Sequence, residues 1–471
     1  MNFRKFLKEH IVILDGGMGT LLQKRGLCPG EHPEMWNISH SDVITEIHKA
    51  YFDAGSNVVN TNTFGANPLK FSDDELERII KAAVENATNA RDMSKAVQPK
   101  FISLDIGPLG RLLKPFGDLS FDDAVSAFSK VVKLGVSFGV DLVTIETMND
   151  SYETKAAVIA AKENCELPII VTNAYGADGK LITGASPEAM VAMLEGLGVD
   201  AIGANCSLGP VQLVEIAERL LSVSSIPVVI KPNAGLPKVV DGETVFDVEP
   251  EEFSDVLCNM CKKGVRVVGG CCGTTPEYIS ELSNKTKPLL PIEIHQKNIS
   301  CISSYTHPVY FGSSPVLIGE RINPTGKKRF KQALAEHDVD YILREGISQM
   351  EKGVHVLDVN VGLPEIDEAS VLCEAISELQ AVIDLPLQID TSDISAMEQA
   401  MRLYNGKPMV NSVNGKKESM EAIFPLVKKY GGLVVALTLD ENGIPDTADG
   451  RIEIAKKLFL QPKNTESQKR I

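Results

Sequence analysis

The chain has 471 residues, enough for two or three domains with large hydrophobic cores. Its formal net charge of −16 argues against non-specific nucleic-acid binding, and it has no run of about 18 apolar residues, so neither nucleic acid nor a membrane is an expected partner. The N-terminus lacks the apolar stretch of a secretory signal, and nine cysteines in such a chain favour a reducing, cytoplasmic setting.

Short β-type runs alternate with amphipathic, helix-length stretches along the first part of the chain. Near-continuously apolar strands that alternate with helices favour an α/β fold, namely a (β/α)8 TIM barrel, with a doubly wound open sheet as the alternative. Both architectures place functional residues at the carboxyl ends of the strands. We therefore predict a barrel over residues 1–290, with strands at 11–17, 57–64, 101–108, 141–148, 168–176, 201–207, 227–235 and 265–275.

The alternation then breaks in a proline-containing stretch without clear periodicity, and we predict an interdomain linker at 291–314. A second barrel of typical size, ~250 residues, would need about three βα units more than remain, so we expect it to be C-terminally truncated. The polar tail at 461–471 is expected to fray. The second β/α pattern covers 315–471, with five strands at 316–326, 354–362, 385–392, 408–415 and 433–443.

Three cysteines fall at predicted strand ends of the first barrel. Cys206 follows the sixth strand, and the adjacent Cys271 and Cys272 follow the eighth between glycines. These ends share one rim, and three thiolates with an open fourth position are the layout of a catalytic zinc site. The alternative is that they are small buried apolar residues, but an adjacent pair between glycines favours the metal. Cys258 and Cys261 form a CxxC inside a helical pattern, where packing is the simpler interpretation.

The same rim carries a glycine-rich run, DGGMGT at 15–20, and an acidic residue at the end of the fourth strand. Glycine-rich backbone that leads into a helix offers N–H groups to a carboxylate, while Asp15 and Glu146 can hold an ammonium group. Together they would bind the α-amino acid end of a substrate and leave its side chain facing the metal. The alternatives are a tight turn that needs glycine and, for the asparagine after the seventh strand, a turn residue instead of a rim ligand or substrate contact. The candidates are Asp15, Gly16, Gly17, Gly19, Thr20, Glu146 and Asn233.

The motifs DGGMGT, GANC and GGCCGTTP resemble those of the zinc-dependent homocysteine S-methyltransferase family over residues 1–290. The resemblance implies that Cys206, Cys271 and Cys272 are the catalytic zinc ligands and that the 15–20 loop and Glu146 bind homocysteine. A free thiol with a pKa of about 8.5 is only a few per cent thiolate at neutral pH, whereas a metal deprotonates a coordinating thiol. The homocysteine thiolate would then be the nucleophile that accepts a methyl group.

Polar side chains also stand at the strand ends of the second part. A ring of carboxylates and amides suits a flat heterocycle with amino-pyrimidine donors, because a carboxylate can accept two N–H bonds from a guanidine-like edge. The alternative is that strand-end Asp and Asn are turn formers. The residues of the ring are Glu320, Asn323, Asp358, Asn360, Asp390 and Asn411.

The motifs GERINPTG, DVNVG, QIDTS and VNSVNG resemble the pterin-binding family of dihydropteroate synthases and folate:corrinoid methyltransferases over 315–445. This resemblance implies 5-methyltetrahydrofolate as the methyl donor, with Asp390 and Asn411 as its contacts. Asn411 could hydrogen-bond N5 of the folate and so act in catalysis, while no strong acid for N5 is evident in the sequence.

A homocysteine module followed by a pterin module resembles the N-terminal half of cobalamin-dependent methionine synthases. The resemblance implies that the methyl group passes from 5-methyltetrahydrofolate to cobalamin and then to homocysteine, giving methionine and tetrahydrofolate. No DxHxxG motif of cobalamin ligation occurs, so cobalamin would be bound by a domain or protein outside this chain. Two alternatives stay open: a cobalamin-independent homocysteine S-methyltransferase that uses betaine or S-methylmethionine, and an inactive zinc-bound binding module.

Overall fold

The computed structural model describes residues 2–240, 243–364 and 366–460, and contacts divide the chain into two compact units. One unit holds the residues up to Pro187 together with Val199–Lys297, and the other holds Glu188–Gly198 and the residues from Asn298 onward. None of the described helices is long and apolar enough to cross a lipid bilayer. The tail at 461–471, for which fraying is expected, lies outside the described residues.

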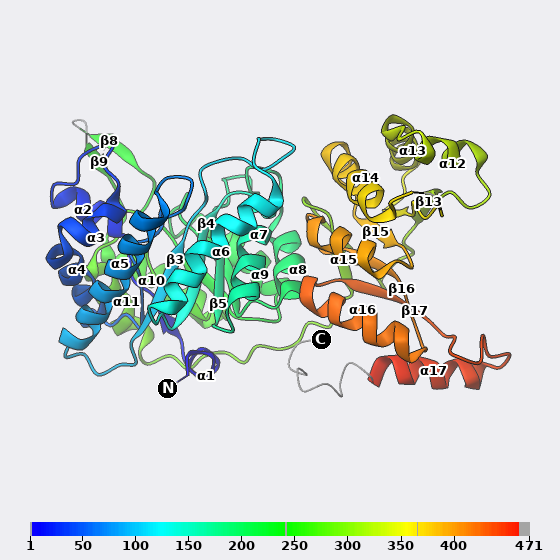
Figure 1. The fold of residues 1–471 in the computed structure, drawn as a ribbon. Helices are drawn as coiled ribbons and strands as arrows, with labels where there is room; N and C mark the ends of the chain where they lie inside the picture. Colours follow the sequence, from blue (N-terminus) through cyan, green and yellow to red (C-terminus); the bar gives the residue numbers. More distant parts are fainter. Residues whose placement is uncertain (1, 241–242, 365, 461–471) are drawn as a thin grey trace. The chain divides into compact units, whose positions relative to one another are not determined.

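The first unit is built on eight parallel strands that form a barrel (Figure 1). Their order is β1-β10-β7-β6-β5-β4-β3-β2, and a parallel bridge between Leu14 and Val58 joins the first strand to the last. The predicted (β/α)8 barrel is confirmed, and each strand lies inside its predicted run. The strands are β1 (Val12–Ile13), β2 (Val58–Asn60), β3 (Phe101–Ile106), β4 (Leu142–Met148), β5 (Ile169–Asn173), β6 (Ala201–Asn205), β7 (Val228–Lys231) and β10 (Val267–Val268).

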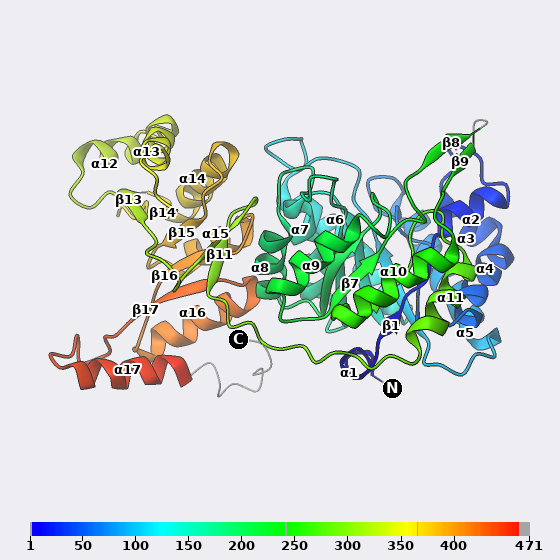
Figure 2. The same ribbon diagram turned by 180° about the vertical axis from the view of Figure 1, so that it is seen from behind.

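Helices alternate with these strands and lie outside them, as Figures 1 and 2 show. Local capping sets several helix starts: Ser72 and Glu75 form a capping box at α5, and the Ser120 and Asp150 side chains accept backbone N–H bonds at α6 and α7. A short antiparallel hairpin of β8 (Lys238–Val240) and β9 (Glu243–Val245) follows β7. The helices are α1 (Phe3–Glu9), α2 (Met18–Lys24), η1 (Pro33–Met35), α3 (Trp36–Ser39), α4 (Ser41–Asp53), α5 (Asp73–Met93), α6 (Phe121–Ser137), α7 (Ser151–Asn164), α8 (Pro187–Leu197), α9 (Leu213–Val223), α10 (Pro250–Lys263) and α11 (Pro276–Thr286).

Helix α1 closes the amino end of the barrel. Its apolar side chains are buried in one cluster with residues from all eight strands, and Phe3 packs edge-on against Phe101 with ring centroids 5.2 Å apart. The buried Arg266 donates hydrogen bonds to the carbonyl oxygens of Leu7 and Lys8, at 3.0 and 2.7 Å. Because this end is apolar and covered, the polar residues inside the barrel gather at the carboxyl end.

The second unit contains five parallel strands in the order β13-β14-β15-β16-β17, as expected for a partial barrel. Each strand again lies inside its predicted run. The strands are β13 (Ile318–Ile322), β14 (Val356–Val359), β15 (Leu387–Asp390), β16 (Met409–Asn414) and β17 (Leu433–Leu437). The helices are α12 (Lys328–Ala335), α13 (Val339–Glu351), α14 (Glu368–Val382), α15 (Ile394–Leu403), α16 (Lys417–Tyr430) and α17 (Ala448–Leu460).

Part of the predicted linker forms a β-hairpin of β11 (Cys301–Ser303) and β12 (Pro308–Tyr310). Ile302 packs with Val356 and Met409 in the core of the second unit, and the Ser303 N–H donates to the Lys407 carbonyl oxygen at 2.9 Å. These strands lie in a stretch with prolines and without clear periodicity, which explains why the sequence did not reveal them.

Candidate active site

Three cysteines come together at the carboxyl ends of β6 and β10. The sulfur atoms of Cys206, Cys271 and Cys272 all lie within 4.8 Å of one another. Three soft thiol ligands at partly exposed positions fit zinc, which takes sulfur ligands and keeps a fourth position for a further ligand in catalytic sites. Cys258 and Cys261, by contrast, are buried within α10. The donor set that the sequence predicted is therefore assembled on one rim of the barrel.

The end of β7 holds the cysteines in place. The Cys206 N–H donates to the Lys231 carbonyl oxygen at 3.1 Å, and the Cys272 N–H donates to Asn233 Oδ1 at 3.1 Å. Cys206 has a φ of +59°, a left-handed conformation that is costly for a residue other than glycine. Asn233, a candidate rim ligand or substrate contact, thus also fixes the backbone of the cysteine segment.

The three thiols hold their protons unequally. The pKa of Cys206 is lowered because Cys271 and Cys272 donate hydrogen bonds to its sulfur. The pKa values of Cys271 and Cys272 are raised, first because their protons are engaged with Cys206 and then by burial. One thiolate therefore forms readily in this cluster, while a bound cation is needed to keep all three deprotonated.

The DGGMGT loop packs directly against the cysteine segment. The Gly17 N–H donates to Thr274 Oγ1 at 3.0 Å, and Thr274 Oγ1 donates to the Cys271 carbonyl oxygen at 2.7 Å. A Cβ on Gly16 would lie 2.6 Å from Thr274 Oγ1, and one on Gly17 would lie 2.8 Å from the Cys271 carbonyl oxygen. A Cβ on Gly19 would meet nothing within 4 Å. Close approach therefore explains two of the three glycines.

Helix α2 begins inside this loop and has seven residues. The Thr20 hydroxyl oxygen on its first turn is buried and has no hydrogen-bond partner. The Tyr51 hydroxyl donates to the Gly17 carbonyl oxygen at 3.1 Å and so anchors the loop from α4. Both the glycine backbone and Thr20 thus line the same edge of the barrel as the cysteines.

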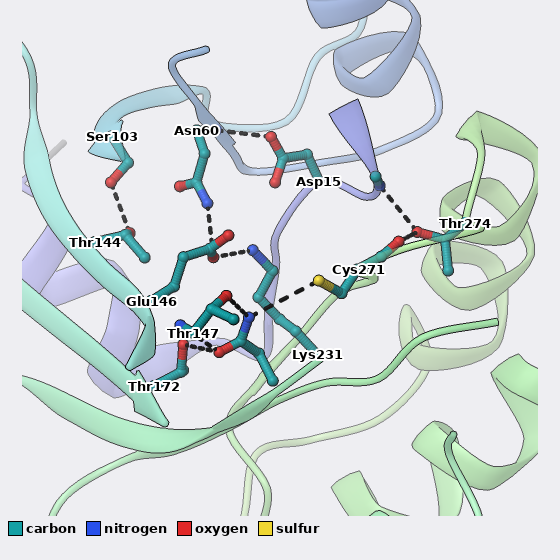
Figure 3. Close-up of polar contacts among 12 residues, drawn as sticks. Asp15, Asn60, Ser103, Thr144, Glu146, Thr147, Thr172, Lys231, Cys271 and Thr274 are labelled. Carbon is teal, nitrogen blue, oxygen red and sulfur yellow. Dashed lines mark hydrogen bonds and ion pairs between the residues drawn. The ribbon is translucent and has the colours of Figure 1, made fainter. Parts of the chain in front are cut away.

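Asn60 links Asp15 to Glu146, and Lys231 pairs with Glu146 (Figure 3). Asn60 donates its backbone N–H to Asp15 Oδ2 at 2.7 Å and its side-chain amide to Glu146 Oε2 at 3.1 Å. Lys231 Nζ lies 2.5 Å from the same Glu146 oxygen, and both side chains are nearly inaccessible to solvent. Burial raises the pKa of Asp15 to about 7 although Lys231 opposes this, and Glu146 and Asp15 raise the pKa of Lys231 against the effect of its own burial.

In the second unit, four predicted residues form one polar network at the ends of β14, β15 and β16. Asn360 donates its amide to Asp390 Oδ2 at 3.0 Å, and the Asn411 and Gln388 amides both donate to Asp358. Burial raises the pKa of Asp358 to about 7, and the nearby Asp390 adds to this while the amides oppose it.

The two predicted residues of β13 and the loop after it stand apart from this network. Glu320 is exposed, and its charge contributes to the raised pKa values of Asp358 and Asp390. Asn323 is buried, and its side-chain oxygen accepts the Thr325 N–H at 2.8 Å, as in an Asx turn.

Comparison with known proteins identifies both units. Residues 12–286 match the family model of homocysteine S-methyltransferase, which covers more than half of the chain. The chain belongs to the homocysteine S-methyltransferase family. Residues 319–461 match the family model of pterin binding enzymes.

The relatives of this family member include methionine synthases. The chain is 29% identical to those of Mycobacterium leprae and Mycobacterium tuberculosis, and each alignment covers 96% of this chain but 40% of the relative. The predicted resemblance to methionine synthases is confirmed, while the chain spans about two-fifths of their length. Among solved structures, it is similar to the metallated form of the homocysteine methyltransferase MmuM from Escherichia coli, with a TM-score of 0.51 and 23% identity over 60% of this chain and 98% of that chain. This similarity shows a shared barrel fold.

Sequence reasoning missed three polar residues that line the barrel of this methyltransferase family member. Lys231 is the single cation at the end of the apolar strand VVIK, which was a usable signal. Asn60 gave none, because asparagine is common at strand ends. Asn205 receives the Thr147 N–H at 2.8 Å and holds its own amide 3.9 Å from the Cys271 sulfur, and it was visible only as part of the GANC motif.

Proposed function

We propose that this chain provides the homocysteine and folate modules of a cytoplasmic methionine synthase, in which a methyl group passes from 5-methyltetrahydrofolate through cobalamin to the homocysteine thiolate. The observation that carries the proposal is the cluster of three cysteine sulfur atoms within 4.8 Å on the rim that also holds Asp15 and Glu146. The methionine synthases among the relatives and the pterin match in the second unit support the methyl donor. None of the nine cysteines forms a disulfide, in keeping with a reducing cytoplasm.

Cys206, Cys271 and Cys272 would hold zinc, which supplies a Lewis acid that keeps a further thiol deprotonated at neutral pH. Asp15 and Glu146 accept hydrogen bonds from the ammonium group of homocysteine, and the 15–20 loop faces its carboxylate with N–H groups other than that of Gly17, which is bonded to Thr274. This arrangement directs the homocysteine sulfur toward the cysteines. The new C–S bond then forms as the bond between the methyl group and its carrier breaks.

The second unit would bind the methyl donor through its polar network. Asp358 can hold a proton at neutral pH because its pKa is raised to about 7, and Asn411 is bonded to it. A proton held there supports departure of tetrahydrofolate, whose N5 must be protonated or polarised as the methyl group leaves. Cobalamin, held by a domain or protein outside this chain, would carry the methyl group. The proposed pterin contacts are Glu320, Asn323, Asp358, Asn360, Asp390 and Asn411.

Zinc content and methyl transfer, measured on the same samples, test this function. The wild-type chain should bind zinc stoichiometrically and methylate homocysteine from added methylcobalamin. Cys271→Ser should lose both properties, because two protein thiolates hold zinc far more weakly than three. Cys28→Ser, which changes an exposed cysteine, serves as the matched control and should keep both. Unchanged zinc stoichiometry in Cys271→Ser would refute the three-cysteine site.

A panel of methyl donors separates the alternatives. The proposal expects no methionine from 5-methyltetrahydrofolate unless cobalamin and its binding domain are added. Turnover of betaine or S-methylmethionine without cobalamin would identify a cobalamin-independent methyltransferase instead. Zinc binding without turnover of any donor would identify an inactive binding module.

A further inference from the structure

A third carboxylate, Asp105, lies inside the barrel near Asp15 and Glu146. Asp105 stands on β3, two residues beyond Ser103 and four beyond Phe101. The Ser103 hydroxyl lies 2.7 Å from that of Thr144 inside the barrel, and Phe101 packs in the core cluster at the amino end. Side chains two apart on a strand point to the same side, so Asp105 faces the barrel interior at its carboxyl end. Electrostatic interactions with Glu146, Lys231 and Asp15 place it in the same polar layer.

Two acceptor atoms in this layer have no donor. Asp105 is only 7% exposed, and its Oδ1 atom is buried without a hydrogen-bond partner. Asn60 is also 7% exposed, and its Oδ1 atom is likewise buried and unpaired, because its amide nitrogen is bonded to Glu146. Buried acceptors are nearly always paired in folded proteins, so two unpaired oxygen atoms on residues that are each linked to Glu146 point to a missing donor.

The residues already there make no hydrogen bond to these two oxygen atoms. Lys231, the one cation among Asp15, Asp105 and Glu146, is committed to Glu146 at 2.5 Å. The Asp105 backbone is fixed independently, since its N–H donates to Thr61 Oγ1 at 3.2 Å and its carbonyl oxygen accepts from Thr63 Oγ1 at 2.8 Å. The backbone thus holds the side chain in position while its Oδ1 atom has no hydrogen-bond partner.

We infer that Asp105, with Asn60, accepts hydrogen bonds from the ammonium group of the amino-thiol substrate and thereby selects an α-amino acid over a thiol that lacks the amine. An ammonium group has three N–H donors and one positive charge, which matches two unpaired acceptors in a polar layer with more carboxylates than cations. This inference rests on the proposed function and adds a substrate-positioning residue to it.

The test compares L-homocysteine with 4-mercaptobutanoate, which has the same thiol and carboxylate but no amine. Binding of each to the zinc-loaded protein is measured by calorimetry for the wild type and for Asp105→Asn. A charged hydrogen bond lost in this way should weaken homocysteine binding at least about tenfold and leave 4-mercaptobutanoate within about threefold. Zinc content should be unchanged and thermal stability should not fall, because Asn has the same shape and Asp105 Oδ1 holds no partner in the protein.

Ser103→Ala is the matched control, since it changes an inward-facing residue one step deeper on the same strand and should leave the ratio of the two affinities unchanged. If Asp105→Asn weakens the binding of both thiols equally, or of neither, the inference is overturned. Homocysteine binding by the wild type, and so the proposed function, would stand. A wild-type protein that binds neither thiol would overturn both.

Discussion

Replacing Lys231 by Met should strongly destabilise the barrel, although it shortens the side chain by little and removes no backbone hydrogen bond. The Lys231 and Glu146 side chains are 2% and 10% exposed, and their charged atoms lie 2.5 Å apart. Without the lysine, Glu146 and Asp15 are left buried with no cation. Loss of one partner from a buried ion pair costs about 3–5 kcal/mol of unfolding free energy.

The cost should depend on pH. In the wild type, the pKa of Asp15 is raised from 3.8 to about 7, so the stability that its protonation contributes is present below about pH 4 and is lost as the pH rises through 7. Removal of Lys231 raises the pKa of Asp15 further, because the attraction that favoured its charged form is gone. The difference in unfolding free energy between wild type and variant should therefore be smallest near pH 5 and largest above pH 7.

Tryptophan fluorescence during urea unfolding can measure this effect. The chain has a single tryptophan, Trp36, which is buried in α3 of the first unit, so its signal reports the barrel and not the second unit. The double variant Lys231→Met with Glu146→Gln removes both charges and should recover most of the loss. A loss below about 1 kcal/mol at pH 8, or a double variant as unstable as the single one, would refute the reasoning.

Two further substitutions test the close contacts that hold the rim and the amino end of the barrel. Gly17→Ala should lower zinc content, because its Cβ would lie 2.8 Å from the Cys271 carbonyl oxygen, whereas Gly19→Ala, with nothing within 4 Å, should bind zinc like the wild type. Equal zinc content in both would contradict the account of the loop. Arg266→Met should speed hydrogen exchange in α1 and cost about 1–3 kcal/mol, because the carbonyl oxygens of Leu7 and Lys8 lose their buried donor. Unchanged exchange in α1 would show that the helix is held by its apolar contacts alone.

The strands were predictable because each one is a short apolar run bounded by polar or glycine residues. All thirteen strands of the two parallel sheets fall inside runs identified from the sequence. The three cysteines could be placed on one rim because they follow strands β6 and β10. The β11–β12 hairpin was not predicted, because its pairing depends on contacts with Val356 and Met409 that lie far along the chain.

The pairings inside the site could not be read from the sequence for a similar reason. Lys231 and Glu146 are separated by 85 residues, and Asn60 lies 86 residues from Glu146, so only barrel closure brings them together. The same holds for the roles of Asn233 and Thr274. Asn233 was predicted as a rim ligand or substrate contact, with a turn residue as the alternative, and Thr274 was given no role, while the structure shows them bonded to the backbone of Cys272 and Cys271.

The polar layer is itself an argument that this end of the barrel binds a ligand. Barrel interiors are ordinarily filled by branched apolar side chains, as the cluster around α1 is here. Burying Asp15, Asp105 and Glu146 around one cation, Lys231, costs stability. The raised pKa of Asp15 and the unpaired oxygen of Asp105 are both signs of this cost. A layer with more carboxylates than cations beside three converging cysteines is the arrangement that the proposed binding of a substrate ammonium group requires.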